Sequence, residues 1–135
     1  MTDKIVALDT NILIYLHDNS NITKRSISKE LAADIPKIST QVISEYLNTL
    51  RRMVNLSKSD LLIQAAELFT QCDVIQVLPS TLLLASELSG RYHFQLFDAI
   101  IVASAIESNC DILYSEDMHH GLKVNNKLTI LNPFL

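Results

Sequence analysis

The stretch that most constrains the fold is a run of four apolar residues, 5–8, that ends on the carboxylate Asp9. Because polar and apolar residues do not alternate in this run, it predicts a short strand buried on both faces, as in the centre of a parallel sheet. In open α/β sheets, ligands bind beyond the carboxyl ends of the strands. Asp9 is therefore either a functional carboxylate at that edge or only the cap of a helix that begins at Thr10. If other carboxylates lie at the same edge of the sheet, the functional role of Asp9 is favoured.

Composition predicts a single globular domain spanning residues 1–135. With 135 residues, 48% of them hydrophobic, the chain can bury a core without disulfides. Its two cysteines, Cys72 and Cys110, match neither a disulfide framework nor a zinc-ligand spacing. The longest uncharged apolar run, around 99–106, is too short to cross a bilayer, and Asp3 and Asp9 fall where a signal peptide needs apolar residues. These features predict a soluble, cytoplasmic protein with no membrane segment.

Several common sites are excluded by what the chain lacks. Its only two glycines, Gly90 and Gly121, cannot form a Walker loop, a dinucleotide fingerprint or a GxSxG elbow. The adjacent histidines at 119 and 120 do not predict a metal site, since neighbouring rings seldom share one ion. A net charge of −4 argues against bulk attraction to nucleic acid, although it allows a local basic rim around an acidic site.

Helical and strand patterns alternate along the chain, which predicts an α/β fold. We expect a single domain with a mainly parallel central sheet of about five strands flanked by helices. The expected strands are 5–8, 37–39, 74–78, 112–115 and 128–131. The expected helices lie near 11–16, 22–33, 40–54, 57–71, 80–88 and 97–106. Pro79 should end the third strand, and Ser80 should cap the helix that follows.

Four carboxylates fall at strand ends or in the early turns of helices. Asp9 and Asp117 follow predicted strands, whereas Glu45 lies in the second turn and Asp98 in the first turn of a predicted helix. Each has a simpler explanation, because Glu is usually solvated and Asp is common at helix starts. Four acids from separate segments, with no cysteine or glycine-rich loop nearby, nevertheless indicate oxygen ligands for a hard divalent cation, Mg²⁺ or Mn²⁺.

With these motifs the sequence closely resembles the PIN-domain family, in particular the VapC-type toxins of toxin–antitoxin pairs. The resemblance covers nearly the whole chain and rests on four matches together: 8–13, Glu45 in its helix, 97–101 and 115–118. It implies that the first and fourth strands lie side by side, with Asp9 next to Asp117. One departure is Gln95-Leu96, which stands where the family often has a small polar residue before the aromatic–Asp pair.

The carboxylate cluster and the resemblance together predict a metal-dependent endoribonuclease. Carboxylates held close together repel one another, and a divalent cation would compensate their charge, polarise the scissile phosphate and activate water. We expect Asp9, Asp98 and Asp117 to be direct ligands, and Glu45 to bind through water or to orient the nucleophile. By resemblance the substrate is RNA. The expected supporting polar groups are Asn11, Ser115 and Glu116.

Two protein partners are expected as well. The helix 80–88 carries Leu82, Leu83, Ala85 and Leu88, which is more apolar surface than one buried face needs, so it predicts a homodimer. The first helix has five consecutive large residues at 12–16, some of which should stay on the surface beside Asp9. That surface would accept an amphipathic helix of an inhibitor, and the resemblance implies that this inhibitor is an antitoxin.

Three other functions remain open at this point. The first is a DNA-directed nuclease or DNA-binding regulator on the same fold, because the residues themselves do not distinguish RNA from DNA. The second is a non-catalytic interaction module that keeps its acids only as helix caps and binds no Mn²⁺. The third is a phosphatase or receiver domain with Asp9 as nucleophile, which the lack of a suitable lysine near the last strands disfavours.

Overall fold

The centre of the protein is a six-stranded sheet, seen here in a computed structural model that describes residues 3–135. The first two residues of the predicted domain lie outside this range. The strands are β1 (Val6–Leu8), β2 (Lys37–Ser39), β3 (Asp73–Ile75), β4 (Ile112–Tyr114), β5 (Lys123–Val124) and β6 (Leu128–Leu131). They follow the order β3-β2-β1-β4-β6-β5, and every neighbouring pair is parallel except β5 with β6. The fold is therefore the predicted α/β class with a mainly parallel sheet.

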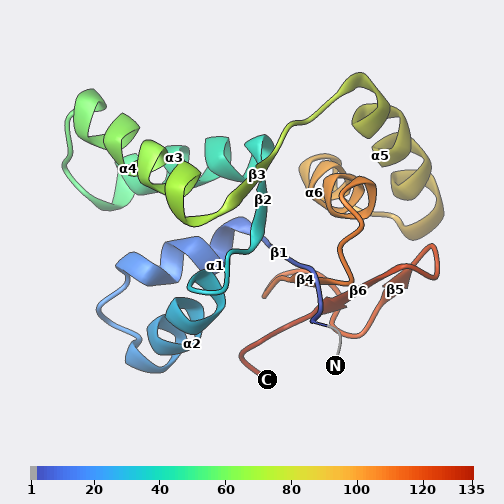
Figure 1. The fold of residues 1–135 in the computed structure, drawn as a ribbon, viewed down its shortest axis with the longest axis horizontal. Coiled ribbons are helices and arrows are strands. Elements are labelled where there is room, and N and C mark those ends of the chain that lie inside the picture. The colour runs from blue at the N-terminus through green and yellow to red at the C-terminus, as the bar shows by residue number, and fades with distance from the viewer. Residues whose placement is uncertain (1–2) are drawn as a thin grey trace.

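Helices cover the sheet from both sides. In the described part of the chain they are α1 (Thr10–Ile14), the short 3-10 helix η1 (Tyr15–His17), α2 (Ile22–Ala32), α3 (Thr40–Met53), α4 (Lys58–Gln71), α5 (Pro79–Tyr92) and α6 (Leu96–Glu107). Figure 1 shows α5 and α6 on one side of β1, β4 and β6, α2 on the other side, and α3 and α4 towards the β3 end. This arrangement leaves the carboxyl ends of β1 and β4 next to the starts of several helices.

Local sequence signals account for most helix starts. Ser39 Oγ accepts a hydrogen bond from the Val42 amide at 3.1 Å, and Ser57 Oγ accepts one from the Asp60 amide at 3.1 Å. Each bond satisfies a backbone donor that the first helical turn leaves without a partner. Helix α6 is buried from Ala99 through Ile106, as its nearly continuous apolar sequence predicts. It forms the centre of the core and thereby fixes the position of its first turn.

Three details differ from the sequence-based expectation. Strand β3 ends at Ile75 instead of reaching residue 78, and Leu78, not Ser80, is the N-cap residue of α5. Pro79 is the first residue of that helix, because its fixed φ suits this position and its missing N–H would have no helical partner there. The two-residue strand β5 was not predicted and raises the number of strands from five to six.

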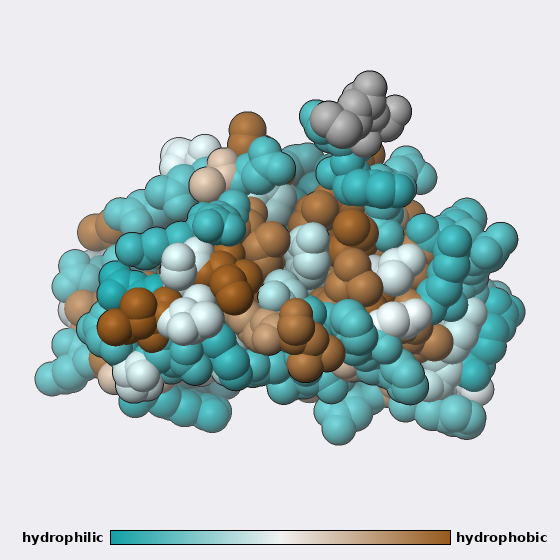
Figure 2. Space-filling view, turned by 90° about the horizontal axis from the view of Figure 1, so that it is seen from below, coloured by the Kyte–Doolittle hydropathy of each residue, from teal (hydrophilic) through white to brown (hydrophobic). Residues whose placement is uncertain are grey.

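On the face of the sheet that α2 covers, one side chain of β4, Tyr114, stays partly accessible to solvent. Leu8 and Tyr114 lie opposite one another in the β1–β4 register, and Tyr114 is half-buried, whereas Leu113 on the opposite face is completely buried. The surface seen from below carries a central group of hydrophobic side chains flanked by hydrophilic ones (Figure 2).

Both cysteines are buried and free. No helix within residues 3–135 is long and apolar enough to cross a membrane.

Candidate active site

Asp9 is held rigidly at the carboxyl end of β1. Its Oδ1 accepts a hydrogen bond from the Thr10 amide at 2.7 Å, and its Oδ2 accepts one from Ser115 Oγ at 2.7 Å. The backbone amide of Asp9 also donates to the Tyr114 carbonyl at 2.9 Å, so β1 and β4 remain paired up to this residue. Asp9 therefore caps α1, as the simpler explanation requires, and is at the same time tied to the segment that follows β4.

The turn after β4 carries Asp117 and is fastened to α1. Asn11 Nδ2 donates to Asp117 Oδ2 at 3.0 Å, and Ser115 Oγ, besides donating to Asp9, accepts from the Met118 amide at 3.2 Å. Asn11 and Ser115, two of the predicted supporting groups, thus connect Asp9 to Asp117. The side-by-side placement of β1 and β4 makes these contacts possible.

Glu116, the third predicted supporting group, points to a different partner. Its carboxylate forms an ion pair with Lys24 of α2 and accepts a hydrogen bond from the Tyr15 hydroxyl at 2.6 Å. Partial burial would raise the pKa of Glu116, but the hydrogen bonds from Lys24 and Tyr15 outweigh it and lower that pKa. Glu116 is therefore an ionised anchor for the turn, and its charge is already compensated.

Three of the four predicted carboxylates have raised pKa values. Burial raises the pKa of Asp9 to about 6, with additional contributions from the charges of Asp98 and Glu45, although its hydrogen bonds oppose the shift. Burial also raises the pKa of Glu45, and the charge of Asp98 adds to it. The pKa of Asp98 is raised by burial and by the charge of Asp117. Each of these acids therefore senses another member of the set.

The four predicted carboxylates line one cavity of about 350 Å³, which we call the carboxylate cavity. Its other lining residues are Thr10, Asn11, Ile14, Tyr15 and Thr49, so no lysine, arginine or histidine of the described residues 3–135 contributes to its wall. The buried hydroxyl oxygen of Thr10 has no hydrogen-bond partner among residues 3–135. A wall with four acids and no basic side chain among residues 3–135, together with a buried hydroxyl without a hydrogen-bond partner, fits a bound cation with its water shell.

The residues fit such an ion in chemistry, but they do not form a closed cage. Within residues 3–135 no group of three histidine, cysteine, aspartate or glutamate side chains is close enough to hold a metal. Mg²⁺ commonly keeps several waters and uses only one or two carboxylates directly. An open cavity lined with acids is therefore compatible with Mg²⁺ or Mn²⁺, and the assignment of individual ligands stays a prediction.

Sequence reasoning missed some of the lining residues. Thr49 follows Glu45 by four positions on α3, so helical spacing alone could have placed both on one face. The contact of Tyr15, another lining residue, with Glu116 could not be found in this way, because Glu116 is about a hundred residues away in the sequence. The same holds for Lys24, which pairs with Glu116 outside the wall of the cavity.

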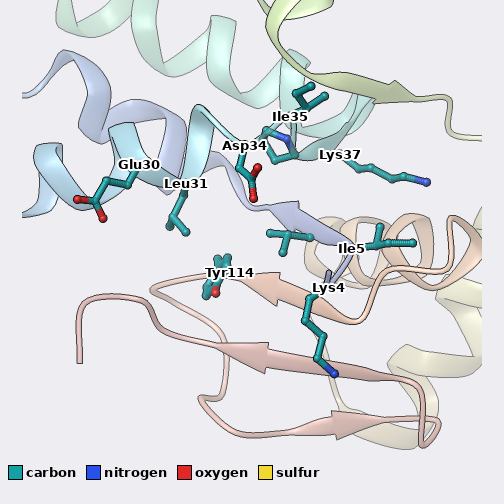
Figure 3. A pocket seen from close by; sticks show the side chains of 10 residues that line it. Lys4, Ile5, Glu30, Leu31, Asp34, Ile35, Lys37 and Tyr114 are labelled. Carbon is teal, nitrogen blue, oxygen red and sulfur yellow. The ribbon is translucent and has the colours of Figure 1, made fainter. Parts of the chain in front are cut away.

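A larger cavity lies elsewhere. About 370 Å³ in volume, it is bounded by the end of α2, the starts of β1 and β2, and Tyr114 of β4, and we call it the α2 cavity (Figure 3). Leu31 and Tyr114 face its interior, whereas Lys37 extends away from it. Its charged lining residues are balanced: Lys4 and Lys37 against Glu30 and Asp34. It brings together none of the four predicted catalytic acids.

Comparison with known families agrees with the geometry. The family model described as "PIN domain" matches residues 6–121. This chain belongs to the PIN-domain family. The matched range contains the four predicted catalytic acids, and the predicted resemblance is confirmed at the level of the family. No curated protein matches the sequence.

Solved structures with the same fold include toxins of toxin–antitoxin pairs. VapC20 of Mycobacterium tuberculosis, described as a sarcin–ricin loop cleaving toxin, is 20% identical to this PIN domain with a TM-score of 0.68, over 83% of this chain and 89% of that one. A toxin–antitoxin complex from Klebsiella pneumoniae is 20% identical with a TM-score of 0.69, over 96% and 97%. VapBC2 of Rickettsia felis, bound to a promoter DNA fragment, is 18% identical with a TM-score of 0.66, over 95% and 99%. At these low identities the similarity establishes the fold.

Proposed function

We propose that this PIN domain is a metal-dependent endoribonuclease and the toxin of a toxin–antitoxin pair. The observation that supports the proposal most strongly is the carboxylate cavity, whose wall contains Asp9, Glu45, Asp98 and Asp117 and, among residues 3–135, no basic side chain. A cluster of this kind is unfavourable by itself and becomes favourable when a divalent cation binds. The similarity to a toxin that cleaves the sarcin–ricin loop supports RNA as the substrate class.

In this proposal Asp9, Asp98 and Asp117 hold Mg²⁺ or Mn²⁺, and Glu45 binds through water or orients the attacking water. The metal supplies charge stabilisation at the phosphate and a more acidic bound water. Ser115 and Asn11 act through the acids that they contact, since they fix the orientation of Asp9 and Asp117. Glu45 accepts a hydrogen bond from Gln41 Nε2 at 3.3 Å, which directs one of its oxygens and leaves the other available to water.

The direct test is cleavage of single-stranded RNA and single-stranded DNA of the same sequence, with Mn²⁺ and with a chelator. We expect RNA to be cut only in the presence of the metal. Cleavage of DNA instead would favour a DNA-directed nuclease, because the carboxylates alone are compatible with either substrate. Failure to bind Mn²⁺ in calorimetry, together with no cleavage of either strand, would indicate an interaction module.

The proposed protein partner is an antitoxin that lays an amphipathic helix beside the carboxylate cavity. Ile12 and Leu13 of the first helix are buried, while Ile14 and Tyr15 are half-buried and line the cavity. This apolar edge next to four acids suits a helix that also places an arginine among the carboxylates. Such a toxin would act in the cytoplasm, where its RNA substrate is found.

The cellular test compares growth of cells that express the chain alone, the Asp9→Asn variant, and the chain with its neighbouring gene. We expect only the unaccompanied wild-type chain to arrest growth. If it is as harmless as the Asp9→Asn variant, the protein has a PIN-domain role other than that of a toxin.

We also propose a homodimer formed through α5. Leu82 and Leu83 are 51% and 73% exposed, whereas Ala85 and Leu88 of the same helix are buried in the core. Leu82 borders an apolar groove of about 360 Å³ between α5 and α6, which a second copy could cover. Sedimentation should show a dimer at micromolar concentration that Leu83→Glu converts to monomer. Leu62→Glu on α4, where Leu62 is 63% exposed, is the matched control and should remain dimeric.

A further inference from the structure

A second hollow adjoins the carboxylate cavity, and we call it the aromatic cavity. It has a volume of about 350 Å³ and shares two wall residues, Asp98 and Asp117, with the carboxylate cavity. Its remaining wall comes from the end of α5 and from the turn after β4, and includes Tyr92, His93, Phe94, Gln95 and His119. The two hollows are therefore neighbours with different chemistry: four acids line one, whereas the other combines two of those acids with aromatic, histidine, glutamine and apolar side chains.

The aromatic side chains of this wall are fixed in place. Tyr92 and Phe94 are half-buried, with ring centroids 5.9 Å apart and an angle of 41° between the ring planes. The Tyr92 hydroxyl accepts a hydrogen bond from the Asn125 amide at 2.8 Å, and Ser89 Oγ donates to the Phe94 carbonyl at 3.0 Å. Rings held in this way form a preorganised surface on which a flat ligand can stack with little loss of entropy.

Polar groups stand at the rim of the aromatic surface. His93 ends α5 in a left-handed conformation, with φ 62° and ψ 35°, which turns the chain sharply into Phe94 and Gln95. Gln95 occupies the N-cap position of α6 but makes no side-chain hydrogen bond to that helix. This use of glutamine is unusual, because Ser, Thr, Asp and Asn cap helices well. Its amide therefore offers both a donor and an acceptor to a ligand.

We propose that the aromatic cavity binds the base of a nucleotide next to the scissile phosphate of single-stranded RNA, a proposal that rests on the ribonuclease function above. The base stacks on Phe94, and Gln95 and His119 hydrogen-bond to its edge, which gives the enzyme a sequence preference at that position. Nucleobases have a π face and a polar edge, and proteins recognise single-stranded RNA by this combination.

Charge and connectivity both favour a base over a phosphate in this hollow. Among residues 3–135 no lysine or arginine lines this hollow to pair with a second phosphate, whereas a base carries no charge and needs no such partner. Since Asp98 and Asp117 border both hollows, a nucleotide whose phosphate reaches the carboxylate cavity can place its own or the adjacent base in the aromatic cavity. The volume lies at the small end of the range for ligand pockets, as a single base requires.

The first experiment needs neither metal nor cleavage. Isotope-labelled protein in chelator is titrated with each of the four ribonucleosides, and backbone amide signals are followed by NMR. We expect saturable shifts at residues 92–95 and 119 for at least one nucleoside, lost in Phe94→Leu and retained in Phe69→Leu, a control on α4 where Phe69 is 57% exposed. Gln95→Ala, at an exposed position that does not endanger the fold, should change which nucleoside binds best. Absence of saturable shifts at these positions overturns the proposal.

The second experiment separates failure of the base site from failure of the proposed function. RNA substrates with an abasic nucleotide at successive positions are cleaved by wild type and by Phe94→Leu. One abasic position should raise KM about 5- to 100-fold in the wild type, with kcat less affected, and should cost nothing further in Phe94→Leu. If RNA is cleaved but the two effects simply multiply at every position, the base site is wrong and the ribonuclease stands. If nucleosides bind at 92–95 but no RNA is cleaved, the base site stands and the ribonuclease is wrong.

Discussion

Two hollows of similar size in this protein differ in the balance of charge in their walls. The α2 cavity measures about 370 Å³ and the carboxylate cavity about 350 Å³, so volume does not distinguish them. The α2 cavity has two lysines and two acids in its wall, whereas the carboxylate cavity has four acids and no basic residue. Of the four acids Asp9 is buried, Glu45 and Asp98 are half-buried and Asp117 is exposed. Unbalanced charges that are partly removed from water are costly for a folded chain and indicate a binding site.

The lysines near each hollow show how the imbalance arises. Lys37, in the wall of the α2 cavity, lies 3.9 Å from an Asp73 carboxylate oxygen and donates to the Ser108 carbonyl at 3.0 Å. Lys24, near the carboxylate cavity, pairs with Glu116 and not with any of the four acids. Lys24 therefore anchors the turn that carries Glu116, and it does not compensate the charge of any of the four acids.

The largest expected effect is the difference in RNA cleavage between two variants, each of which lacks one acid of one cavity. Asp98→Asn removes a proposed metal ligand, and we expect it to lower Mn²⁺-dependent cleavage of RNA by a factor on the order of 100 or more, since even residues that only orient a ligand cost about 10- to 100-fold. Asp34→Asn, in the α2 cavity, should cleave as wild type does. Metal-free Asp98→Asn should melt at a slightly higher temperature than wild type, because one repelling charge is gone. Equal cleavage by both variants would remove the distinction between the hollows.

The next effect is the pH dependence of stability that Asp9 confers. Its pKa is raised from 3.8 to about 6, so the folded protein binds the proton more tightly than the unfolded chain does. The free energy of unfolding of the metal-free protein should therefore fall as the pH rises from about 4 to about 6, by about 3 kcal/mol for this group. The raised pKa of Glu45 and of Asp98 acts in the same direction, and the lowered pKa of Glu116 acts against it.

Asp9→Asn isolates this contribution. Urea unfolding in chelator at a series of pH values should give a smaller decrease for the variant than for wild type, and the difference curve should have its slope between about pH 4 and pH 6. Added Mn²⁺ should stabilise wild type increasingly as the pH rises, because the metal competes with protons for the carboxylates. Parallel curves for the two proteins would contradict the raised pKa of Asp9.

Two buried serines differ in their hydrogen bonds, and replacing each by alanine should have smaller effects on stability, opposite in sign. Ser115 Oγ donates to Asp9, whereas Ser28 Oγ, on α2, has no hydrogen-bond partner among residues 3–135. Ser115→Ala at pH 8 should lower the free energy of unfolding by about 1.5–3 kcal/mol, because a hydrogen bond to a charged group is lost, and should weaken Mn²⁺ binding. Ser28→Ala removes an unsatisfied hydroxyl and should raise the melting temperature without changing Mn²⁺ affinity. Calorimetric melting and Mn²⁺ titration of both variants test the contrast.

Much of the fold was predictable because its elements are encoded locally. The apolar run before Asp9 became β1, and the nearly all-apolar stretch around Asp98 became the buried helix α6. Ser39 and Ser57 cap their helices, as serines placed just before a helix commonly do. The four acids could be singled out from their positions at strand and helix ends. Each was a weak candidate by itself, and the order of the strands brings all four to the wall of one cavity.

Other features depend on contacts that the local sequence does not specify. Strand β5 has only two residues and pairs with β6 across a short turn, so no periodicity reveals it. Pro79 both ends an extended segment and begins a helix, and its local preference does not separate these roles. Glu116 was expected to support the site, and its pairing with Lys24 was not predicted because that lysine is 92 positions away. Long-range pairing therefore decided which acids stay uncompensated.

The smallest expected effect comes from breaking that long-range pair. Lys24→Met keeps the length of the side chain but removes the charge that binds Glu116, so the turn that carries Asp117 loses one of its attachments while Asn11 still holds the other. We expect cleavage of RNA to fall by no more than about tenfold, with a small decrease in melting temperature. Lys37→Met breaks the ion pair with Asp73 beside the α2 cavity and should lower the melting temperature in the same way without changing cleavage. Initial cleavage rates at saturating Mn²⁺ distinguish the two variants. An equal loss of rate in Lys37→Met would mean that the loss reflects general destabilisation. The Lys24–Glu116 pair would then have no special connection to the site.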